Sequence, residues 1–135
     1  MDVNRCTGCR SCEIACKQEN QLGASLRWRR VREMTNEYAG SATMYFLSMA
    51  CNHCEDPVCV KVCPTQALGQ RDDGIVLIDD GKCIGCRYCQ WACPYDALEF
   101  NSETGRMTKC TMCVQRVDAG QEPACVEGCP TDALQ

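Results

Sequence analysis

The stretch CIGCRYCQWACPYDAL, residues 83–98, decides how this chain must fold. It places Cys83, Cys86, Cys89 and Cys93 at gaps of two, two and three residues, and Pro94 follows the last of them directly. Thiols this close in sequence close only small, strained disulfide loops, whereas several thiols on one tight loop can converge on a metal centre. The stretch therefore predicts a metal site. The position of Cys93 leaves open whether the four cysteines bind one metal centre or two.

All 16 cysteines of the 135-residue chain fall into groups of four. So high a cysteine content also fits the disulfide scaffold of a small secreted protein. The N-terminal sequence MDVNRCTGC, however, has neither the basic region nor the apolar region of a secretory signal. Metal centres are therefore favoured over disulfides. The four groups are Cys6, Cys9, Cys12 and Cys16; Cys51, Cys54, Cys59 and Cys63; Cys83, Cys86, Cys89 and Cys93; and Cys110, Cys113, Cys125 and Cys129.

The spacing within the groups distinguishes iron-sulfur clusters from zinc. Structural zinc sites combine two Cys-x-x-Cys pairs that lie a dozen or more residues apart, or mix cysteine with histidine. The first and third groups instead read Cys-x-x-Cys-x-x-Cys-x-x-x-Cys, which is the run that bacterial ferredoxins use for 4Fe-4S clusters. In that run three thiols hold one cluster and the fourth binds its neighbour. The pattern predicts 4Fe-4S clusters rather than zinc.

The second and fourth groups carry insertions between their second and third cysteines. The insertion is EDPV in the second group and VQRVDAGQEPA in the fourth. In each case the closing Cys-x-x-x-Cys step is unchanged. We expect the cluster site to persist in both groups, with a different loop covering it.

A repeat of the form Cys-Pro-x-x-Ala-Leu begins at Cys63, Cys93 and Cys129. A repeated supersecondary unit is its simplest explanation, and its Ala-Leu pairs are expected to be core contacts. Between the second and third groups, GQRDDGIVLIDDGKC combines an Asp-Gly turn with a β-branched run, which predicts a β-hairpin. Residues 51–100 are thus predicted to form a complete two-cluster module of the ferredoxin type.

The first and fourth groups then remain, and each can supply the fourth ligand of the other's cluster if the two ends of the chain meet. The resulting prediction is an α+β fold of two bacterial-ferredoxin-like two-cluster modules, in which the inner module is inserted into a split outer one, with short helices and small β-hairpins. Residues 1–50 would form the first half of the outer module together with a hairpin insert, and residues 101–135 would form its second half. The alternative pairing, first group with second and third with fourth, is not barred by the spacing.

The segment between the first two groups is predicted to contain a hairpin, and before it a helix that leads away from the first group, IACKQENQL. The strands of the hairpin would be LRWRRVREM and TMYFLSM, with NEYAGS as the turn. Four arginines in it form a basic patch that is either a solvated strand face or a docking surface for an acidic partner: Arg27, Arg29, Arg30 and Arg32. Aromatic residues in this segment and beside the third group are expected to shield clusters and fill the core: Trp28, Tyr38, Tyr45, Phe46, Tyr88, Trp91 and Tyr95.

No catalytic residues are predicted, because the sequence shows no paired carboxylates, no Ser/His/Asp arrangement and no phosphate-binding glycine loop. His53 is expected not to be a ligand, but either to form a hydrogen bond beside a cluster or to lie at the surface. Arg10 and Arg87 occupy equivalent positions and are either solvated or raise the potential of a nearby cluster. The formal net charge of −4 argues against nucleic acid as a main partner, and no apolar run is long enough to span a membrane.

Three segments carry a resemblance to a known family: MYFLSMACNHCEDPVCVKVCPTQAL, DDGIVLIDDGKCIGCRYCQWACPYDA, and GRMTKCTMC together with PACVEGCP. They closely resemble the iron-sulfur electron-transfer subunits of dimethyl sulfoxide reductase and related molybdopterin oxidoreductases. The resemblance implies four 4Fe-4S clusters with the nested pairing. Its implied ligand sets are Cys6, Cys9, Cys12 and Cys129; Cys51, Cys54, Cys59 and Cys93; Cys83, Cys86, Cys89 and Cys63; and Cys110, Cys113, Cys125 and Cys16.

The resemblance further implies a non-catalytic subunit that carries electrons between a large molybdenum or tungsten pterin catalytic subunit and a redox partner. That partner would be a membrane quinol-handling subunit or a soluble carrier. The protein is expected to be soluble or peripheral at the cytoplasmic membrane, on either side of it. The alternatives are a free-standing soluble polyferredoxin, or the iron-sulfur subunit of a formate dehydrogenase, aldehyde oxidoreductase or hydrogenase complex.

Overall fold

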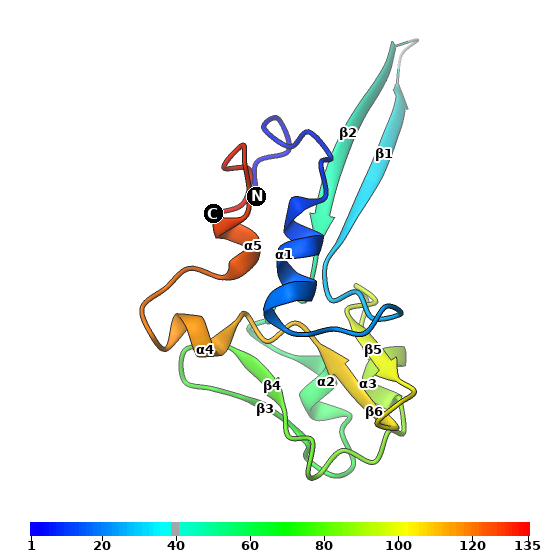
Figure 1. The fold of residues 1–135 in the computed structure, drawn as a ribbon. Coiled ribbons are helices and arrows are strands. Elements are labelled where there is room, and N and C mark those ends of the chain that lie inside the picture. The colour runs from blue at the N-terminus through cyan, green and yellow to red at the C-terminus, as the bar shows by residue number, and fades with distance from the viewer. Residues whose placement is uncertain (39–40) are drawn as a thin grey trace.

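The structure is a computed structural model that describes residues 1–38 and 41–135, and the side chains of all residues except 36–42. Short helices and short strands alternate along the chain (Figure 1). In chain order they are α1 (Ser11–Glu19), β1 (Arg30–Tyr38), β2 (Ser41–Met49), α2 (Val58–Lys61), β3 (Leu68–Gln70), β4 (Val76–Ile78), α3 (Tyr88–Ala92), β5 (Leu98–Asn101), β6 (Arg106–Lys109), α4 (Val114–Val117) and α5 (Ala124–Glu127). This is the predicted small α+β architecture.

Within the part of the chain that the structure describes, each strand pairs with its sequence neighbour as an antiparallel hairpin. β3 and β4 form the hairpin predicted between the second and third groups, and Gly74 at its turn has a φ of +86°. β1 and β2 form the hairpin of the first insert, which projects from the rest of the molecule as an arm (Figure 1). The sequence prediction missed the third hairpin, β5 with β6. Its signal was the turn-forming sequence NSETGR between two runs that contain apolar residues.

Three of the helices end where the proline of the repeat predicts. α2, α3 and α5 stop within two residues of Cys63, Cys93 and Cys129, each of which is followed by proline. Proline cannot continue a helix because it lacks an N–H group and clashes with the preceding turn. In the first group Lys17 takes the place of proline, and α1 accordingly continues past Cys16 to Glu19.

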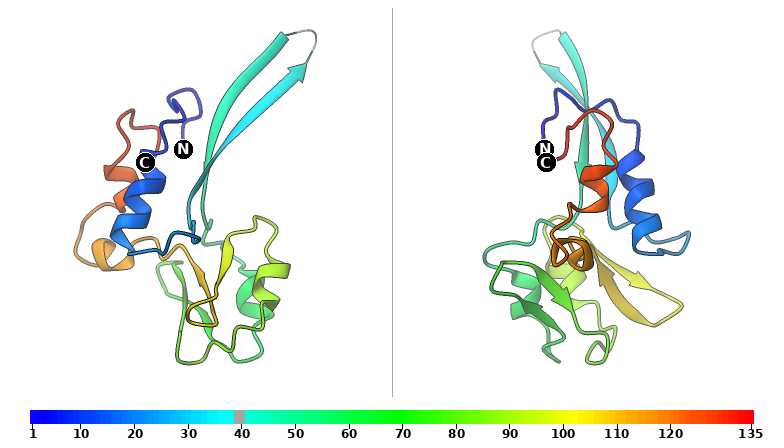
Figure 2. Two further views of the ribbon diagram at one scale, coloured as in Figure 1. Left: turned by 45° about the vertical axis from the view of Figure 1, so that its right-hand side comes forward. Right: turned by 60° about the vertical axis from the view of Figure 1, so that its left-hand side comes forward.

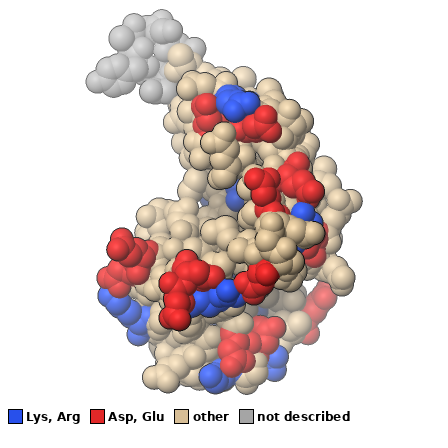
Figure 3. Space-filling model, turned by 90° about the vertical axis from the view of Figure 1, so that its left-hand side faces the viewer, with Lys and Arg blue, Asp and Glu red and all other residues tan. Residues whose placement is uncertain are grey.

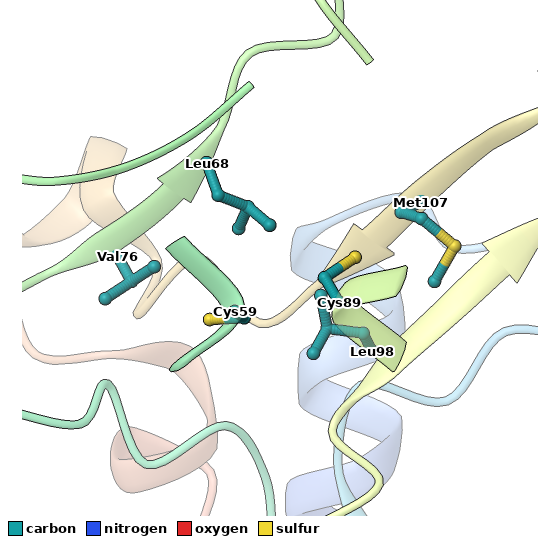
Figure 4. Packing of buried hydrophobic residues seen from close by; sticks show 6 residues of the cluster. All are labelled: Cys59, Leu68, Val76, Cys89, Leu98 and Met107. Atoms are coloured by element: carbon teal, nitrogen blue, oxygen red, sulfur yellow. The ribbon is translucent and has the colours of Figure 1, made fainter. Parts of the chain in front are cut away.

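Buried hydrophobic side chains of the described residues form two separate cores. One lies between α2, α3 and the hairpins β3–β4 and β5–β6, and its buried members are Cys59, Leu68, Val76, Cys89, Leu98 and Met107 (Figure 4). The other lies where α1 packs against α5, and its buried members are Cys12, Val31, Cys125 and Leu134. The leucines of all three Ala-Leu pairs lie in these cores, which confirms their predicted role. Both cores contain group cysteines, so each is built around a cysteine site.

The two ends of the chain lie side by side (Figure 2). The backbone N–H of Asp2 donates to the carbonyl of Ala133 at 2.7 Å, and Arg5 forms an ion pair with Asp132 at 3.3 Å. The helix of the first cysteine group, α1, also packs against the helix of the last group, α5. At the other boundary, the predicted end of the inner module near residue 100 falls inside the β5–β6 hairpin, whose Met107 belongs to the same core as Leu68.

Several local predictions need correction. β1 begins at Arg30 rather than Leu26, because Arg30 pairs with Met49 at the base of the hairpin. Residues 36–38 of the predicted turn extend the strand, while residues 39–40 and the side chain of Tyr38 lie outside the described part.

The aromatic residues beside the third group do not fill the core, contrary to the prediction. The exposed fractions of Tyr88, Trp91 and Tyr95 are 52%, 75% and 46%. The reason is that α3 turns Cys89 inward and its own aromatic side chains toward solvent.

The arginines of the predicted basic patch have different contacts and do not act as one surface. Arg30 forms ion pairs with Asp96 and Glu99, so it ties the base of the hairpin to β5 and is not a solvated strand face. Arg29 donates to the hydroxyl of Ser48 at 2.9 Å. Over the face drawn in Figure 3, acidic and basic side chains are interspersed and form no single-sign surface.

Leu98→Ala is expected to destabilise the inner core by about 2–5 kcal/mol, because Leu98 is 1% exposed and the cavity left behind cannot fully collapse. The measurement is the guanidinium unfolding midpoint of the cluster-loaded protein under anaerobic conditions. Ile14→Ala, on α1, is the control because its side chain is 57% exposed, and it should change the stability by roughly 0.5 kcal/mol or less. Equal losses in the two variants would contradict this location of the core.

Candidate iron-sulfur centres

All four cysteine groups begin with the same backbone turn. The residue directly before the second cysteine has a positive φ in each group, and glycine occupies this position in two of them. This left-handed residue turns the chain so that the first two thiols of a group face the same side of the loop. The four residues are Gly8, His53, Gly85 and Met112, with φ values of +71°, +44°, +68° and +58°.

A second repeated turn follows the last cysteine of three groups. In the Cys-Pro-x-x-Ala-Leu repeat the residue before alanine is left-handed. In two of the three copies the alanine N–H donates back to the cysteine sulfur, with N···S distances of 3.2 Å for Ala67 to Cys63 and 3.3 Å for Ala133 to Cys129. Although burial acts in the opposite direction, hydrogen bonds from this turn lower the pKa of both thiols. The repeat thus favours thiolates, the form in which cysteine binds metal.

Two cavities are each lined by four cysteines from two different groups. Cys6, Cys9 and Cys12 line the first together with Cys129 from the far end of the chain. The second cavity is lined by Cys51, Cys54 and Cys59 together with Cys93 of the third group. In both cavities three cysteines come from one loop, and the fourth is the last cysteine of another group.

A third cavity, of about 380 Å³, is lined by Cys110, Cys113 and Cys125 together with Cys16 of the first group. Burial, and then the neighbouring thiolates of Cys110, Cys125 and Cys113, raises the pKa of Cys16 to about 12. Cys51 of the second group also lines this cavity. The fourth-group and second-group sites are therefore neighbours.

The remaining four cysteines meet at the inner core. Cys63 and Cys83 pack against the core that contains buried Cys89. Burial, and then the nearby thiolates of Cys59, Cys63 and Cys86, raises the pKa of Cys89 to about 11. Cys63, from the second group, thus lies close to the third group's thiols.

Two buried polar atoms test whether a sulfide-containing cofactor fits these sites. Among the described residues, the buried side-chain atoms without a hydrogen-bond partner are His53 Nε2 and Thr111 Oγ1. Both residues lie between the first two cysteines of a group. Buried donors without partners are costly unless something accepts their hydrogen bonds, and cluster sulfurs are acceptors. Within the same described part, no three His, Cys, Asp or Glu side chains are placed to bind a single metal ion.

Of the two positions expected for His53, the structure has the hydrogen-bonded one: the ring lies beside the second-group cysteines with a defined orientation. Its Nδ1 accepts a hydrogen bond from the Val76 N–H at 3.0 Å. Burial, and then the charge of Lys109, lowers the pKa of His53 to about 4, so the ring is neutral near pH 7. Because Nδ1 is the acceptor, the single ring proton lies on Nε2.

The two arginines predicted to be equivalent occupy equivalent backbone positions. Arg10 and Arg87 are left-handed residues that begin α1 and α3, with φ values of +62° and +65°. The guanidinium of Arg87 lies over the ring of Phe100, 3.8 Å from the ring centroid. This contact fixes Arg87 beside the third group.

Two cations lie close to the cysteine sites that were not predicted from the sequence to be there. Arg29 lines the cavity of the fourth-group thiols, and its partner Ser48 contacts the sulfur of Cys12 at 3.4 Å. Lys109 is buried beside Cys110. A basic residue directly before the first cysteine of a group was the available signal for Lys109, whereas nothing local distinguished Arg29 from the other arginines of its segment.

Comparison with known proteins shows the family of this chain. A family described as a 4Fe-4S dicluster domain matches residues 42–135, and a second family of the same description matches residues 5–67. Relatives with high identity cover nearly the whole sequence. It is 48% identical to the probable anaerobic dimethyl sulfoxide reductase chain YnfG of Escherichia coli K12, over 100% of this sequence and 70% of that protein. The protein belongs to the family of iron-sulfur subunits of dimethyl sulfoxide reductase and its relatives.

Other members of the family are similar over comparable lengths. The thiosulfate reductase electron transfer subunit PhsB of Salmonella typhi is 43% identical over 99% of this sequence and 71% of its own length. A subunit of the tetrathionate reductase of Salmonella typhimurium is 48% identical over 96% of this sequence and 52% of its own length.

The cofactors of this family member are four 4Fe-4S clusters, two for each dicluster domain. Its 16 cysteines match the four thiolates that each of these clusters requires. No helix of the described residues has the length and apolar character needed to cross a membrane.

Proposed function

We propose that this chain is a non-catalytic electron-transfer subunit that holds its four clusters in one row. The observation that carries the proposal is the contact between cysteine sets of successive sites. Cys12 of the first site and Cys125 of the fourth-group site share one buried core. Cys51 lines the cavity of the fourth-group thiols, and Cys59 and Cys89 share the other core. The sites thus follow one another without a gap in the order first, fourth, second and third group.

The proposed ligand sets cross between groups. The cavities and the inner core support sets in which three thiols of one group are joined by the last thiol of another. When bound, each cubane takes up and releases one electron. The protein holds the thiolates, donates N–H groups to their sulfurs and excludes water. The proposed sets are Cys6, Cys9, Cys12 and Cys129; Cys16, Cys110, Cys113 and Cys125; Cys51, Cys54, Cys59 and Cys93; and Cys63, Cys83, Cys86 and Cys89.

The nested arrangement of modules belongs to the same proposal. The pairing of the chain ends and the packing of α1 against α5 support an outer module that is split by the inner one. The single core shared by both inner hairpins supports an inner module that extends from residue 51 to Lys109.

The proposed partners are a large molybdenum or tungsten pterin catalytic subunit and a second redox partner, either a membrane quinol-handling subunit or a soluble carrier. The relatives are named as single chains or subunits of reductases, which supports an assembly of several subunits. Exposed apolar residues beside the third-group thiols support a protein contact at that end of the row. They are Ile84, Tyr88, Trp91 and Tyr95, with exposed fractions of 46% to 75%.

Anaerobic purification at low salt tests the proposed function. We expect about 16 iron atoms and about 16 acid-labile sulfides per polypeptide, and co-elution with a large pterin-containing protein. A polypeptide that elutes alone with a full iron content would support the free-standing polyferredoxin instead. A colourless polypeptide that contains zinc would contradict both.

A further inference from the structure

Lys109, the last residue of β6, is a buried cation in the middle of the molecule. It is 2% exposed, and its ammonium group donates to the carbonyl oxygens of Val76 and Cys110, the latter at 2.8 Å. No carboxylate among the described residues pairs with it. A buried charge that has only neutral acceptors is strongly unfavourable unless an anionic group lies nearby. The fold therefore places Lys109 where negative charge is expected.

The contacts of Lys109 locate that negative charge at two neighbouring sites. Its bond to the Cys110 carbonyl attaches it to the loop that carries the fourth-group thiols. Its bond to the Val76 carbonyl attaches it to the peptide strand whose N–H holds His53, between Cys51 and Cys54. Lys109 thus lies at the junction of the second-group and fourth-group sites.

We propose that Lys109 is a buried counter-cation shared by the second-group and fourth-group clusters, and that it raises the reduction potential of both. The inference rests on the proposed function, in which these two sites are the middle of the row. Reduction of either centre by one electron, taken from an adjacent centre that is oxidised by one, adds one negative charge beside the ammonium group. A fixed positive charge in a poorly screened interior favours that reduced state.

His53 extends the same arrangement. Because Val76 N–H occupies Nδ1, the buried Nε2–H is left without a partner in the described part of the protein and is available to donate to a cluster sulfur. A hydrogen bond of that kind also favours the reduced state. Lys109 and His53 are joined through the single peptide strand of Val76, so the charge and the donor are held together by one element.

The test replaces Lys109 in the cluster-loaded protein and follows all four centres by anaerobic redox titration with electron paramagnetic resonance. Lys109→Gln keeps a hydrogen-bond donor but removes the charge, whereas Lys109→Arg keeps the charge. We expect Lys109→Gln to shift two of the four transitions to lower potential, so that at a fixed potential the ratio of reduced to oxidised centre falls at least about tenfold. The other two transitions should move less, and Lys109→Arg should remain close to the unmodified protein.

Lys61→Gln is the matched control. It removes the same charge from the helix that carries Cys59, but its side chain is 62% exposed and pairs with Asp56. Water and the carboxylate screen this charge, so its loss should leave all four transitions nearly unchanged.

The outcomes separate this inference from the proposed function. Full iron content with four unchanged transitions in Lys109→Gln would overturn the inference and leave the proposed function intact. Loss of clusters in Lys109→Gln with retention in Lys109→Arg would support the counter-cation, because the charge is what Lys109→Arg keeps and Lys109→Gln removes. An unmodified protein without iron would contradict the proposed function itself.

Discussion

Serine in place of Cys93 is expected to remove the cluster that we propose Cys51, Cys54 and Cys59 to hold, and to leave the cluster proposed for Cys83, Cys86 and Cys89 in place. The expectation follows from the cavity that Cys93 lines together with the second-group thiols, a contact that crosses from one group to another. Iron should fall from about 16 to about 12 atoms per polypeptide.

Double variants can establish which cluster is lost without any spectral assignment. If Cys93 and Cys54 serve one cluster, replacing both should cost no more iron than replacing either, and about 12 atoms should remain. Cys93→Ser combined with Cys86→Ser should remove two clusters and leave about 8 atoms. The reverse pattern would show that the third group holds a cluster by itself and that the crossing is wrong.

Cys63→Ser provides the reciprocal control. Cys63 belongs to the second group but packs with the third-group thiols. Cys63→Ser combined with Cys86→Ser should lose no more iron than Cys86→Ser alone. Cys63→Ser combined with Cys54→Ser should lose one more cluster than Cys54→Ser alone. Agreement of both sets of variants would establish the exchange of fourth ligands in the inner module.

Gly85→Ala is expected to prevent the third-group loop from closing. Gly85 has a φ of +68°, and a Cβ atom at this position would overlap the carbonyl oxygen of Gly105 in the β5–β6 turn. Backbone atoms on both sides cannot yield without moving the hairpin. Left-handed alanine costs about 1–2 kcal/mol and the overlap adds about 1–3 kcal/mol or more, so a total loss of roughly 2–5 kcal/mol or more is expected.

Gly105→Ala is a closely matched control, because Gly105 has the same φ of +68° and a Cβ there would meet no atom within 4 Å. Only the conformational cost of about 1–2 kcal/mol remains. Unfolding midpoints of the two cluster-loaded variants in guanidinium, together with their iron contents, measure the difference. Similar midpoints would show that the contact with Gly105 does not constrain the loop.

The nature of the sites could be predicted from the sequence because it depends on local spacing. Thiols two residues apart must lie on one loop, so Cys83, Cys86 and Cys89 lie close together whatever the rest of the chain does. The proline after Cys93 predicted where α3 ends, and Asp73-Gly74 predicted the β3–β4 turn, because each of these constraints acts over a few residues.

The long-range features could not be predicted in the same way. The exposure of Trp91 depends on which side of α3 faces the core, and one short helix does not specify that. The roles of Arg29 and Arg30 diverge because Ser48 and Glu99 happen to lie within reach after folding. Lys109 is distinguished from other lysines only by its burial, which results from packing of β6 between other elements.

The sequence alone thus determined the chemistry: four groups of thiols, their clusters and the loops that present them. Tertiary structure decided which thiols lie together and which charges lie between the sites. The cavity that Cys6, Cys9 and Cys12 share with Cys129, more than a hundred residues away, forms only because α1 packs on α5. Local spacing determines which cysteines share a loop. The position of a thiol that comes from a distant segment, or of a buried cation such as Lys109, depends on the packing of the whole chain.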